Sequence, residues 1–306
     1  MENLPMQAIV AQGEAVGSEY LGALRDSAAV VDDSAELLQR MRKDGYIYLR
    51  SFFSREDTMA ARRDIFTQLA SVDEIEEPAI DGIYTGRSTR DEKHSDRGRF
   101  WRSVSETWTL RRLSHGRQLH QVMDVLLGEE SRVQDYLFLR PAGPGKHTHI
   151  HCDAPFFTGT TQQVATAWIA LGDVPAQMGP LFIVENSHHF DDIRQQFRGI
   201  NISDNLSCKT SLDMSPLQFA QERNTRLLTT DFTAGDVLIF GMYLLHGALD
   251  NVSTQKKVRL SCDVRYQIAS ADLDPRYFGS DPTGTTGAGY GELVGAKAMT
   301  EDWHQR

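Results

Sequence analysis

The sequence predicts a mainly β protein with flanking helices: a double-stranded β-helix, the jelly-roll barrel also found in cupins, preceded by N-terminal helices. Residues 1–130 carry mostly helical patterns, whereas residues 131–270 break into short apolar runs separated by Gly, Pro, Asp and Asn. Helices followed by many short strands are typical of a barrel covered by helices. No repeat, low-complexity tract or linker divides the sequence. We therefore expect a single domain over residues 1–306, with residues 271–306 as a C-terminal extension.

Three stretches of the N-terminal part have the apolar periodicity of helices. The first covers residues 32–43 and is followed by Gly45, a residue type that often terminates helices. The second begins after Ser54, whose hydroxyl can cap a helix. The third covers residues 110–127 and is predicted to form one or two helices that end at Gly128.

Four apolar segments bounded by turn residues are the expected centre of the barrel: residues 165–171, 179–188, 234–240 and 258–266. Residues 190–222, which lie between them, are polar and helix-like. We expect this stretch to be an insertion over one face of the barrel.

Composition and charge argue against two classes of partner. The 306-residue chain carries 42 acidic and 32 basic residues, a formal charge of −10 that repels nucleic acids and anionic membranes. No segment approaches the roughly 20 apolar residues that span a bilayer, and residues 1–5 lack the start of a signal peptide. The three cysteines, Cys152, Cys208 and Cys262, indicate a reducing compartment. We expect a cytoplasmic protein with neither nucleic-acid nor membrane partners; the sequence does not indicate its oligomeric state.

The tripeptide His151-Cys152-Asp153, followed about ninety residues later by His246, is the strongest functional signal. Alternate residues of a β-strand project to the same face, so His151 and Asp153 can bind one metal ion while Cys152 packs into the core on the other face. A second histidine from a distant strand would complete a triad that leaves the other side of the metal open for substrates. Turn-rich segments lead into both halves of this motif.

These motifs resemble the phytanoyl-CoA dioxygenase family of Fe(II)- and 2-oxoglutarate-dependent oxygenases. Residues 43–52 contain a Gly-Tyr pair followed by apolar residues, which resembles the N-terminal strand of that family. Residues 179–188 resemble its glycine-to-Ser-His turn. The resemblance extends from about Ser34 to the C-terminus.

The resemblance implies a role for each of five residues. His151, Asp153 and His246 would hold Fe(II). Arg259 would pair with the far carboxylate of 2-oxoglutarate, and Trp168 would line the pocket of this cosubstrate. No further catalytic side chain is expected beyond the metal ligands.

Two features leave the cosubstrate site partly open. Relatives often carry a serine two residues after the second histidine, where this chain has Ala248. Arg140 and Arg265 are alternative partners for a carboxylate, although the position of Arg259 after the second histidine favours Arg259.

The activity that the resemblance implies is oxidation of an unactivated C–H bond of a small molecule by O2, with release of succinate and CO2. Related halogenases replace the carboxylate ligand with a small residue. The intact Asp153 therefore favours hydroxylation, desaturation or ring chemistry over halogenation.

His147 and His149 lie on the same face of the predicted strand and suggest an alternative function. A cupin-type metalloenzyme that does not use 2-oxoglutarate would bind its metal through His147, His149, Asp153 and His246. A barrel that binds a small ligand without catalysis is a third interpretation. Arg259 favours the oxygenase, because a cupin needs no arginine to hold a cosubstrate.

Residues 87–102 are rich in basic side chains within an acidic chain. A solvated surface loop is the first interpretation of such a run. The alternative is a mobile segment that closes over the iron pocket and contacts substrate through Arg97, Arg99 and Arg102.

Overall fold

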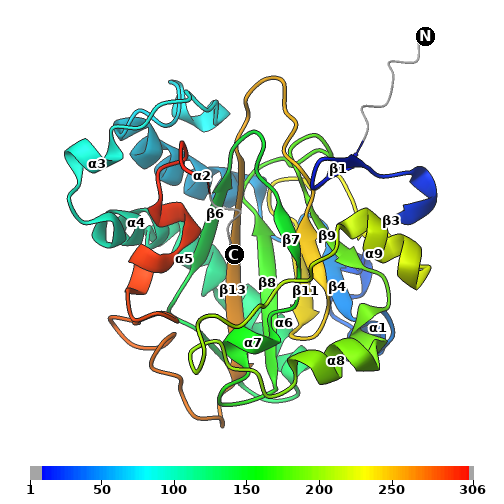
Figure 1. Ribbon diagram of the computed structural model, residues 1–306. Coiled ribbons are helices and arrows are strands. Elements are labelled where there is room, and N and C mark those ends of the chain that lie inside the picture. Colours follow the sequence, from blue (N-terminus) through cyan, green and yellow to red (C-terminus); the bar gives the residue numbers. More distant parts are fainter. Residues whose placement is uncertain (1–8, 303–306) are drawn as a thin grey trace.

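Two β-sheets packed face to face form the centre of the computed structural model, which describes residues 9–302 (Figure 1). Residues 1–8, which include the stretch without a signal-peptide pattern, and residues 303–306 lie outside this part. The larger sheet has the order β4-β11-β8-β13-β5, and β6 also pairs with β13; the smaller sheet has the order β3-β10-β9-β12-β7. The strand bounds are β3 Leu21–Ala23, β4 Tyr46–Leu49, β5 Ser131–Val133, β6 Phe138–Ala142, β7 Thr148–His151, β8 Val164–Ala170, β9 Leu181–Val184, β10 Leu227–Thr229, β11 Val237–Gly241, β12 His246–Ala248 and β13 Arg259–Ile268, and a separate hairpin joins β1 Val10–Ala11 to β2 Glu14–Ala15. This arrangement confirms the predicted double-stranded β-helix.

Helices cover the outside of the barrel, as predicted. Helix α1 packs on β4, and α6 packs on β8 and β13 of the larger sheet. Helix α8 and all but the last residue of α9 fall within the predicted insertion at residues 190–222, and both helices lie on the side of the smaller sheet (Figure 1). The helix bounds are α1 Ser34–Asp44, α2 Arg55–Ser71, α3 Arg90–Lys93, α4 Arg97–Ser105, α5 Trp108–Ser114, α6 Arg117–Leu127, α7 Ala154–Phe157, α8 Asp191–Phe197 and α9 Pro216–Arg223.

Local signals set the ends of the first helices. The Ser54 hydroxyl accepts a hydrogen bond from the backbone N–H of Asp57 at 3.0 Å and donates one to the Asp57 carboxylate at 2.8 Å, which caps α2. Gly45 ends α1 at a φ of 79°, a conformation that suits glycine. Gly128 ends α6 in the same way. These are the boundaries that the sequence predicts.

Strand β13 is buried along its whole length because the sheet is covered on both faces. Successive side chains of β13 point alternately to the two faces of the sheet. Those on the outer face, under the helices, are apolar, and those on the inner face, inside the barrel, are polar. The inner face carries Arg259, Ser261, Asp263, Arg265 and Gln267. Charged side chains inside a barrel are costly unless paired, so this face is a candidate for a binding site.

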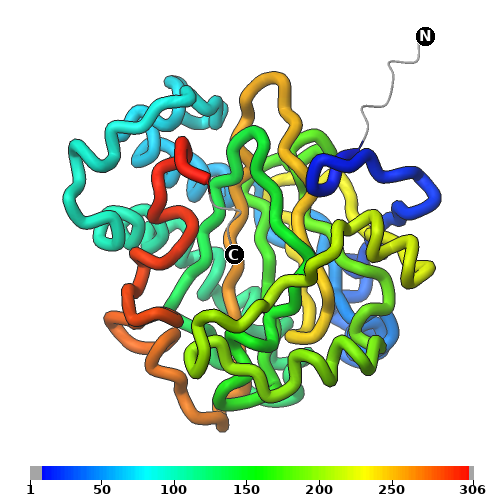
Figure 2. Tube along the Cα trace, viewed as in Figure 1, coloured from blue at the N-terminus to red at the C-terminus, as the bar shows by residue number. Residues whose placement is uncertain are grey.

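The C-terminal extension packs against the stretch that was predicted to be a basic loop. The 3-10 turns Gly289–Glu292 and Val294–Ala296 contact α4, and Figure 2 shows this red segment running beside residues 90–105. Arg90 is fully buried, pairs with Glu74 at 2.7 Å and donates to the backbone carbonyls of Gly295 and Lys297. Residues 87–102 therefore include α3, most of α4 and one partner of a buried ion pair, and are not only a surface loop.

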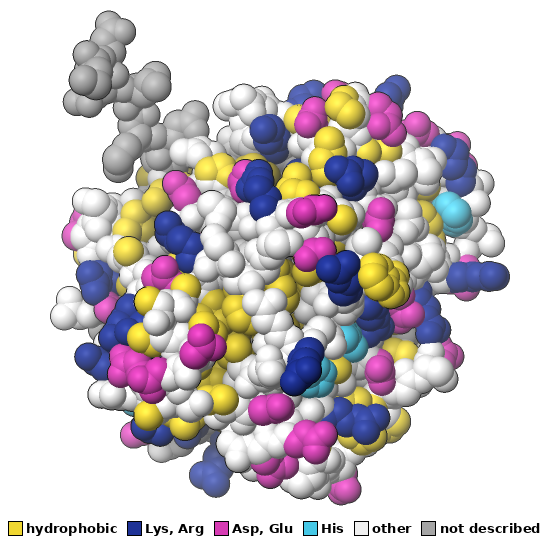
Figure 3. All heavy atoms as spheres, turned by 180° about the vertical axis from the view of Figure 1, so that it is seen from behind, with side chains coloured by type: hydrophobic (Ala, Val, Ile, Leu, Met, Phe, Trp, Pro, Cys, Tyr) yellow, Lys and Arg dark blue, Asp and Glu magenta, His cyan; other side chains and the backbone are white. Residues whose placement is uncertain are grey.

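Charges are distributed evenly over the face seen in Figure 3, where basic and acidic side chains intermingle. Within residues 9–302, no helix has both the length and the apolar composition that crossing a membrane requires.

Candidate metal centre

Strand pairing brings the two predicted histidine ligands together. His151 is the last residue of β7, and His246 is the first residue of β12. The two strands are antiparallel neighbours, and these two residues are direct partners in the pairing. Asp153 follows His151 by two residues, at the start of α7 near the lower end of the barrel in Figure 1.

The three side chains converge on one point. The Nε2 atoms of His151 and His246 each lie 3.8 Å from Oδ1 of Asp153. One donor atom from each residue lies within 4.8 Å of the others, which is a spacing that a shared metal ion would bridge. Among residues 9–302, this is the single group of three or more His, Cys, Asp or Glu side chains with that geometry. The arrangement of two imidazoles and one carboxylate suits a non-haem Fe(II) centre with open positions.

Hydrogen bonds fix the ring orientation of both histidines. The Nδ1–H of His151 donates to the carbonyl of His149 at 2.9 Å, and the Nδ1–H of His246 donates to the carbonyl of Leu244 at 3.0 Å. The lone pair of each Nε2 is therefore free for a metal. Burial lowers the pKa of His151 to about 3 and also lowers the pKa of His246, so both rings are neutral, the state that binds metals.

Two partners orient the carboxylate ligand. Oδ2 of Asp153 accepts hydrogen bonds from the Thr166 hydroxyl at 2.6 Å and from the Arg265 guanidinium at 2.9 Å, which leaves Oδ1 directed at the histidines. Burial on its own would raise the pKa of Asp153, but the neighbouring Arg265 charge and the hydrogen bond from Thr166 act in the opposite direction, and the pKa lies well below its usual range. Asp153 is therefore ionised and held in one orientation, with Oδ1 free to bind a metal ion.

The turn before β12 also supports the centre. The Ser187 hydroxyl accepts a hydrogen bond from the backbone N–H of Leu245 at 2.9 Å, one residue before His246. The Ser-His turn at residues 187–188 thus helps to position the strand that carries His246, and Cys152 is buried in the core as expected.

The alternative histidines lie outside the triad. The rings of His147 and His149 stack with centroids 5.2 Å apart, and Nδ1 of His147 lies 3.3 Å from a carboxylate oxygen of Asp250. Neither joins the group of side chains that could share a metal with Asp153. This geometry disfavours the cupin arrangement.

A cavity of about 180 Å³ opens beside the triad. Its walls include the aromatic rings of Phe138, Phe156 and Phe157 and the basic side chains of Arg140 and Arg265. The segments 210–211 and 292–294 complete the walls. Sequence analysis missed these two segments, because nothing local marks a surface loop or a C-terminal turn as part of a cavity.

Arg259 and Trp168 lie in the barrel interior. Arg259 is buried; it donates to the carbonyl of Gly179 at 2.9 Å, while its Nε has no partner among the described residues. Trp168 is buried on β8 opposite Asp263 and packs on Phe232, with ring centroids 4.7 Å apart. Asp263 in turn binds Arg140 at 2.5 Å.

The structure does not bring Arg97, Arg99 and Arg102 to the triad. All three lie on α4, and none lines the cavity beside the metal ligands. Arg97 pairs with Asp91, and Arg102 pairs with Asp281. Contact of these side chains with substrate remains a prediction that depends on movement of α4.

Comparison with known proteins agrees with this geometry. A model of the family described as "Phytanoyl-CoA dioxygenase (PhyH)" matches residues 41–259. A curated relative, 1-deoxypentalenic acid 11-beta-hydroxylase from Streptomyces arenae, is 29% identical over 135 residues. That match covers 42% of this chain and 44% of the relative, so it spans less than half of the relative's length.

Solved structures share the fold. The α-ketoglutarate-dependent carbocyclase SnoK from nogalamycin biosynthesis aligns with a TM-score of 0.54 and 21% identity, over 85% of this chain and 91% of that chain. The epimerase SnoN from the same biosynthesis aligns with a TM-score of 0.51 and 20% identity, over 82% of this chain and 92% of that chain. The apo form of EctD from S. alaskensis aligns with a TM-score of 0.51 and 17% identity, over 87% of this chain and 85% of that chain. Because the family model matches more than two thirds of the sequence, in a range that includes all three triad residues, this chain belongs to the phytanoyl-CoA dioxygenase family.

Proposed function

We propose that the protein is an Fe(II)- and 2-oxoglutarate-dependent dioxygenase that hydroxylates, or otherwise oxidises, an unactivated C–H bond of a small molecule and releases succinate and CO2. The convergence of His151, Asp153 and His246 at one end of the barrel carries this proposal. Bound there, Fe(II) would supply the site at which 2-oxoglutarate and O2 react. The described residues include free thiols at Cys152, Cys208 and Cys262, which agrees with the proposed cytoplasmic location.

The inner face of β13 fits 2-oxoglutarate. Arg259 Nε, Ser261 Oγ and two guanidinium nitrogens of Arg265 are buried without hydrogen-bond partners among the described residues. Unpaired buried polar groups are rare and costly, and a carboxylate bound beside Arg259 and Ser261, which are two residues apart on β13, would satisfy those two groups. We propose that Arg259 pairs with the far carboxylate of 2-oxoglutarate, and that Trp168 forms one wall of its pocket.

The remaining residues of the cavity would hold the substrate and exclude water. The rings of Phe138, Phe156 and Phe157 make one side of the cavity apolar. A substrate that presents an apolar C–H region to the triad would fit this surface. Thr166 and Arg265 would keep one oxygen of Asp153 occupied, so that the carboxylate takes a single position on the metal.

The direct test is turnover of 2-oxoglutarate. Protein reconstituted with Fe(II) should form succinate from 2-oxoglutarate when it is screened against pools of small metabolites, and a chelator should stop the reaction. Substrate oxidation that continues unchanged when 2-oxoglutarate is omitted would instead support the cupin-type alternative.

Replacing Arg259 with lysine should raise the apparent KM for 2-oxoglutarate by about tenfold or more, because an ammonium group cannot reproduce the two parallel hydrogen bonds of a guanidinium. The KM for the organic substrate should change much less. An unchanged KM for 2-oxoglutarate would move the role to Arg265 or Arg140, both of which line the cavity beside the triad.

Ser261 is expected to supply the hydroxyl that Ala248 lacks. Its side chain is fully buried two residues after Arg259, on the same face of β13. Ser261→Ala should weaken binding of 2-oxoglutarate about three- to tenfold, the usual net contribution of one hydrogen bond. Calorimetry with Mn(II) in place of iron measures this without turnover. If Ser261 has this role, adding Ala248→Ser should recover part of the lost affinity, whereas an unchanged affinity of Ser261→Ala would rule the role out.

A further inference from the structure

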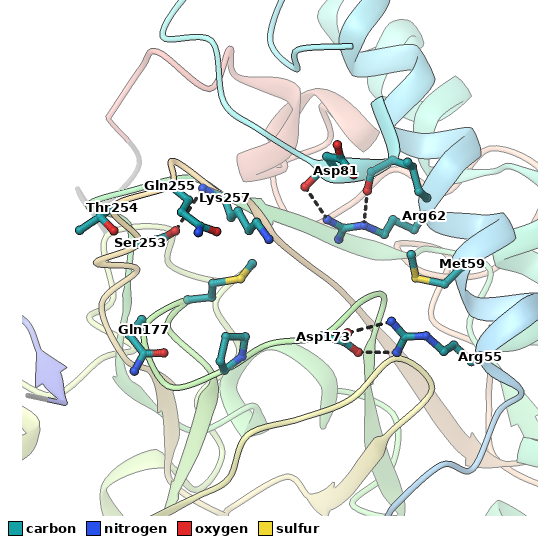
Figure 4. Close-up of a pocket in the computed structure, with 13 residues that line it drawn as sticks. Arg55, Met59, Arg62, Asp81, Asp173, Gln177, Ser253, Thr254, Gln255 and Lys257 are labelled. Carbon is teal, nitrogen blue, oxygen red and sulfur yellow. Dashed lines mark hydrogen bonds and ion pairs between the residues drawn. The ribbon is translucent and has the colours of Figure 1, made fainter. Parts of the chain in front are cut away.

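A second and larger cavity lies at the opposite end of the barrel from the triad. Its volume is about 520 Å³ (Figure 4). Helix α2, residues 80–81, the connection after β8 and the loop between β12 and β13 line it, and none of the three triad residues is part of its walls. Its walls contain the basic side chains of Arg55, Arg62 and Lys257.

Arg62 is a buried cation whose hydrogen bonds go to backbone carbonyls. Only 6% of this residue is exposed. Its guanidinium donates to the carbonyls of Ile80 at 3.0 Å, Leu171 at 3.2 Å and Asp81 at 3.4 Å. Carbonyl oxygens satisfy these N–H groups but do not neutralise the charge. A guanidinium has five N–H donors, so donors remain for a ligand.

Two glycines make room for this guanidinium. A Cβ atom on Gly82 would lie 2.5 Å from one terminal nitrogen of Arg62, and a Cβ on Gly172 would lie 2.6 Å from the other. Gly172 also has a φ of 148°, which side chains rarely adopt. The local backbone is therefore shaped around a positive charge.

Lys257 adds a second cation without a carboxylate partner. Its side chain is partly buried, and its ammonium group makes no ion pair or hydrogen bond within residues 9–302. Figure 4 shows Lys257 and Arg62 pointing toward one another across the cavity. Arg55 differs, because Asp173 holds it through two contacts of 2.6 and 2.8 Å. Asp81 accepts a hydrogen bond from Arg62 through its backbone carbonyl, and the carboxylates of Asp81 and Asp173 act on the Arg62 charge without forming an ion pair with it. Among the described residues, Lys257 and Arg62 are therefore the cations of this cavity that form no ion pair.

We propose that this cavity is a second ligand site, for a small organic anion whose carboxylate or phosphate group lies between Lys257 and Arg62. The thioether side chains of Met59 and Met178 line the same cavity and would contact an apolar part of the ligand. An anion there would be bound by two cations, neither of which forms an ion pair with a carboxylate of the described residues. The site is separate from the triad, so it does not depend on the proposed oxygenase activity.

The test uses metal-free protein and three probes of equal chain length: hexanoate, hexyl phosphate and neutral hexanol. Calorimetry should detect binding of at least one of the two anions, with hexanol about tenfold weaker or worse. The anion that binds more tightly identifies the charged group of the natural ligand. Absence of binding by either anion at millimolar concentration would overturn the proposal.

A matched pair of variants locates the binding. Lys257→Gln should weaken binding of the preferred anion by about tenfold, because it removes one of the two unpaired cations. Lys256→Gln removes an equal charge from an exposed position on the same loop and should leave the affinity unchanged. Equal affinities of wild type and Lys257→Gln would place the ligand elsewhere and overturn the proposal. Arg62 itself is a poor test, because its loss would leave buried carbonyls without donors.

Discussion

Replacing His246 with alanine should abolish iron binding and lower kcat/KM by at least about three orders of magnitude, which corresponds to roughly 4 kcal/mol of transition-state stabilisation. The triad supplies three ligand atoms within 4.8 Å of one another, and two of them do not define a metal site with fixed geometry. His151→Ala and Asp153→Ala should have the same effect. Metal analysis of the purified variants and assays of succinate formation measure both quantities.

The neighbouring histidines provide matched controls for this experiment. His147→Ala and His149→Ala remove imidazoles from the same segment but not from the triad, so both variants should retain iron. Iron content is the better readout, since both residues line the cavity and could affect substrate binding. Loss of iron in these two variants, with iron retained in His151→Ala, would establish the cupin-type ligand set. Circular dichroism of each variant shows whether the fold is retained.

The convergence of His151, Asp153 and His246 could be predicted in part, because two of the three residues are close in the sequence; their role as metal ligands stays a prediction. His151 and Asp153 are two residues apart, so their closeness can be read from the sequence. The expectation that both lie on one strand is wrong, because β7 ends at His151 and the backbone turns into α7 at Asp153. The partner His246 required a resemblance to known sequences, because its position opposite His151 depends on the pairing of β12 with β7. The resemblance also indicated Arg259, whose role as a cosubstrate ligand stays a prediction.

The support of the metal centre could not be predicted in the same way. Strands β8 and β13 are neighbours, and their register places Thr166 directly opposite Arg265. Both side chains therefore reach Asp153. Strand periodicity places Arg265 on the face of Arg259, but it does not say which strand lies alongside or in which register. Arg265 was therefore considered only as an alternative partner of 2-oxoglutarate.

The basic stretch at residues 87–102 shows why composition is a weak guide to a loop. Its charges suggested a solvated segment, but Arg90 pairs with the buried Glu74, which lies 16 residues earlier. Phe100 and Trp101 are buried as well, and Arg90 lies over both rings. A buried arginine and an exposed one are identical in sequence, and only the tertiary partners distinguish them.

Arg265→Met should lower the free energy of unfolding of the metal-free protein by about 3–5 kcal/mol, the usual cost of removing one partner from a buried ion pair. Arg265 and Asp153 are both only 2% exposed, and Arg265 also lies over the rings of Phe138 and Phe157. Methionine retains much of the apolar contact but leaves the Asp153 carboxylate buried without its cation. Denaturant unfolding of the two proteins measures the difference.

The loss of stability should depend on pH and on metal in a defined direction. In the wild type, Asp153 has a lowered pKa, so the stabilisation by its ion pair is fully present above the pKa of an unfolded aspartate, about 3.9, and is lost as the pH falls below it. The difference between wild type and Arg265→Met should therefore shrink as the pH falls. A divalent metal ion supplies another positive charge to Asp153, so saturating Mn(II) should also reduce the difference.

A second substitution separates the ion pair from simple loss of packing. Asp153→Asn combined with Arg265→Met removes both charges, while the asparagine side chain can still accept a hydrogen bond from Thr166. If the uncompensated carboxylate causes the instability, the double variant should be more stable than Arg265→Met alone. If lost packing causes it, the double variant should be no more stable than the single one. In that case Arg265 would stabilise the fold mainly through its contacts with the rings of Phe138 and Phe157.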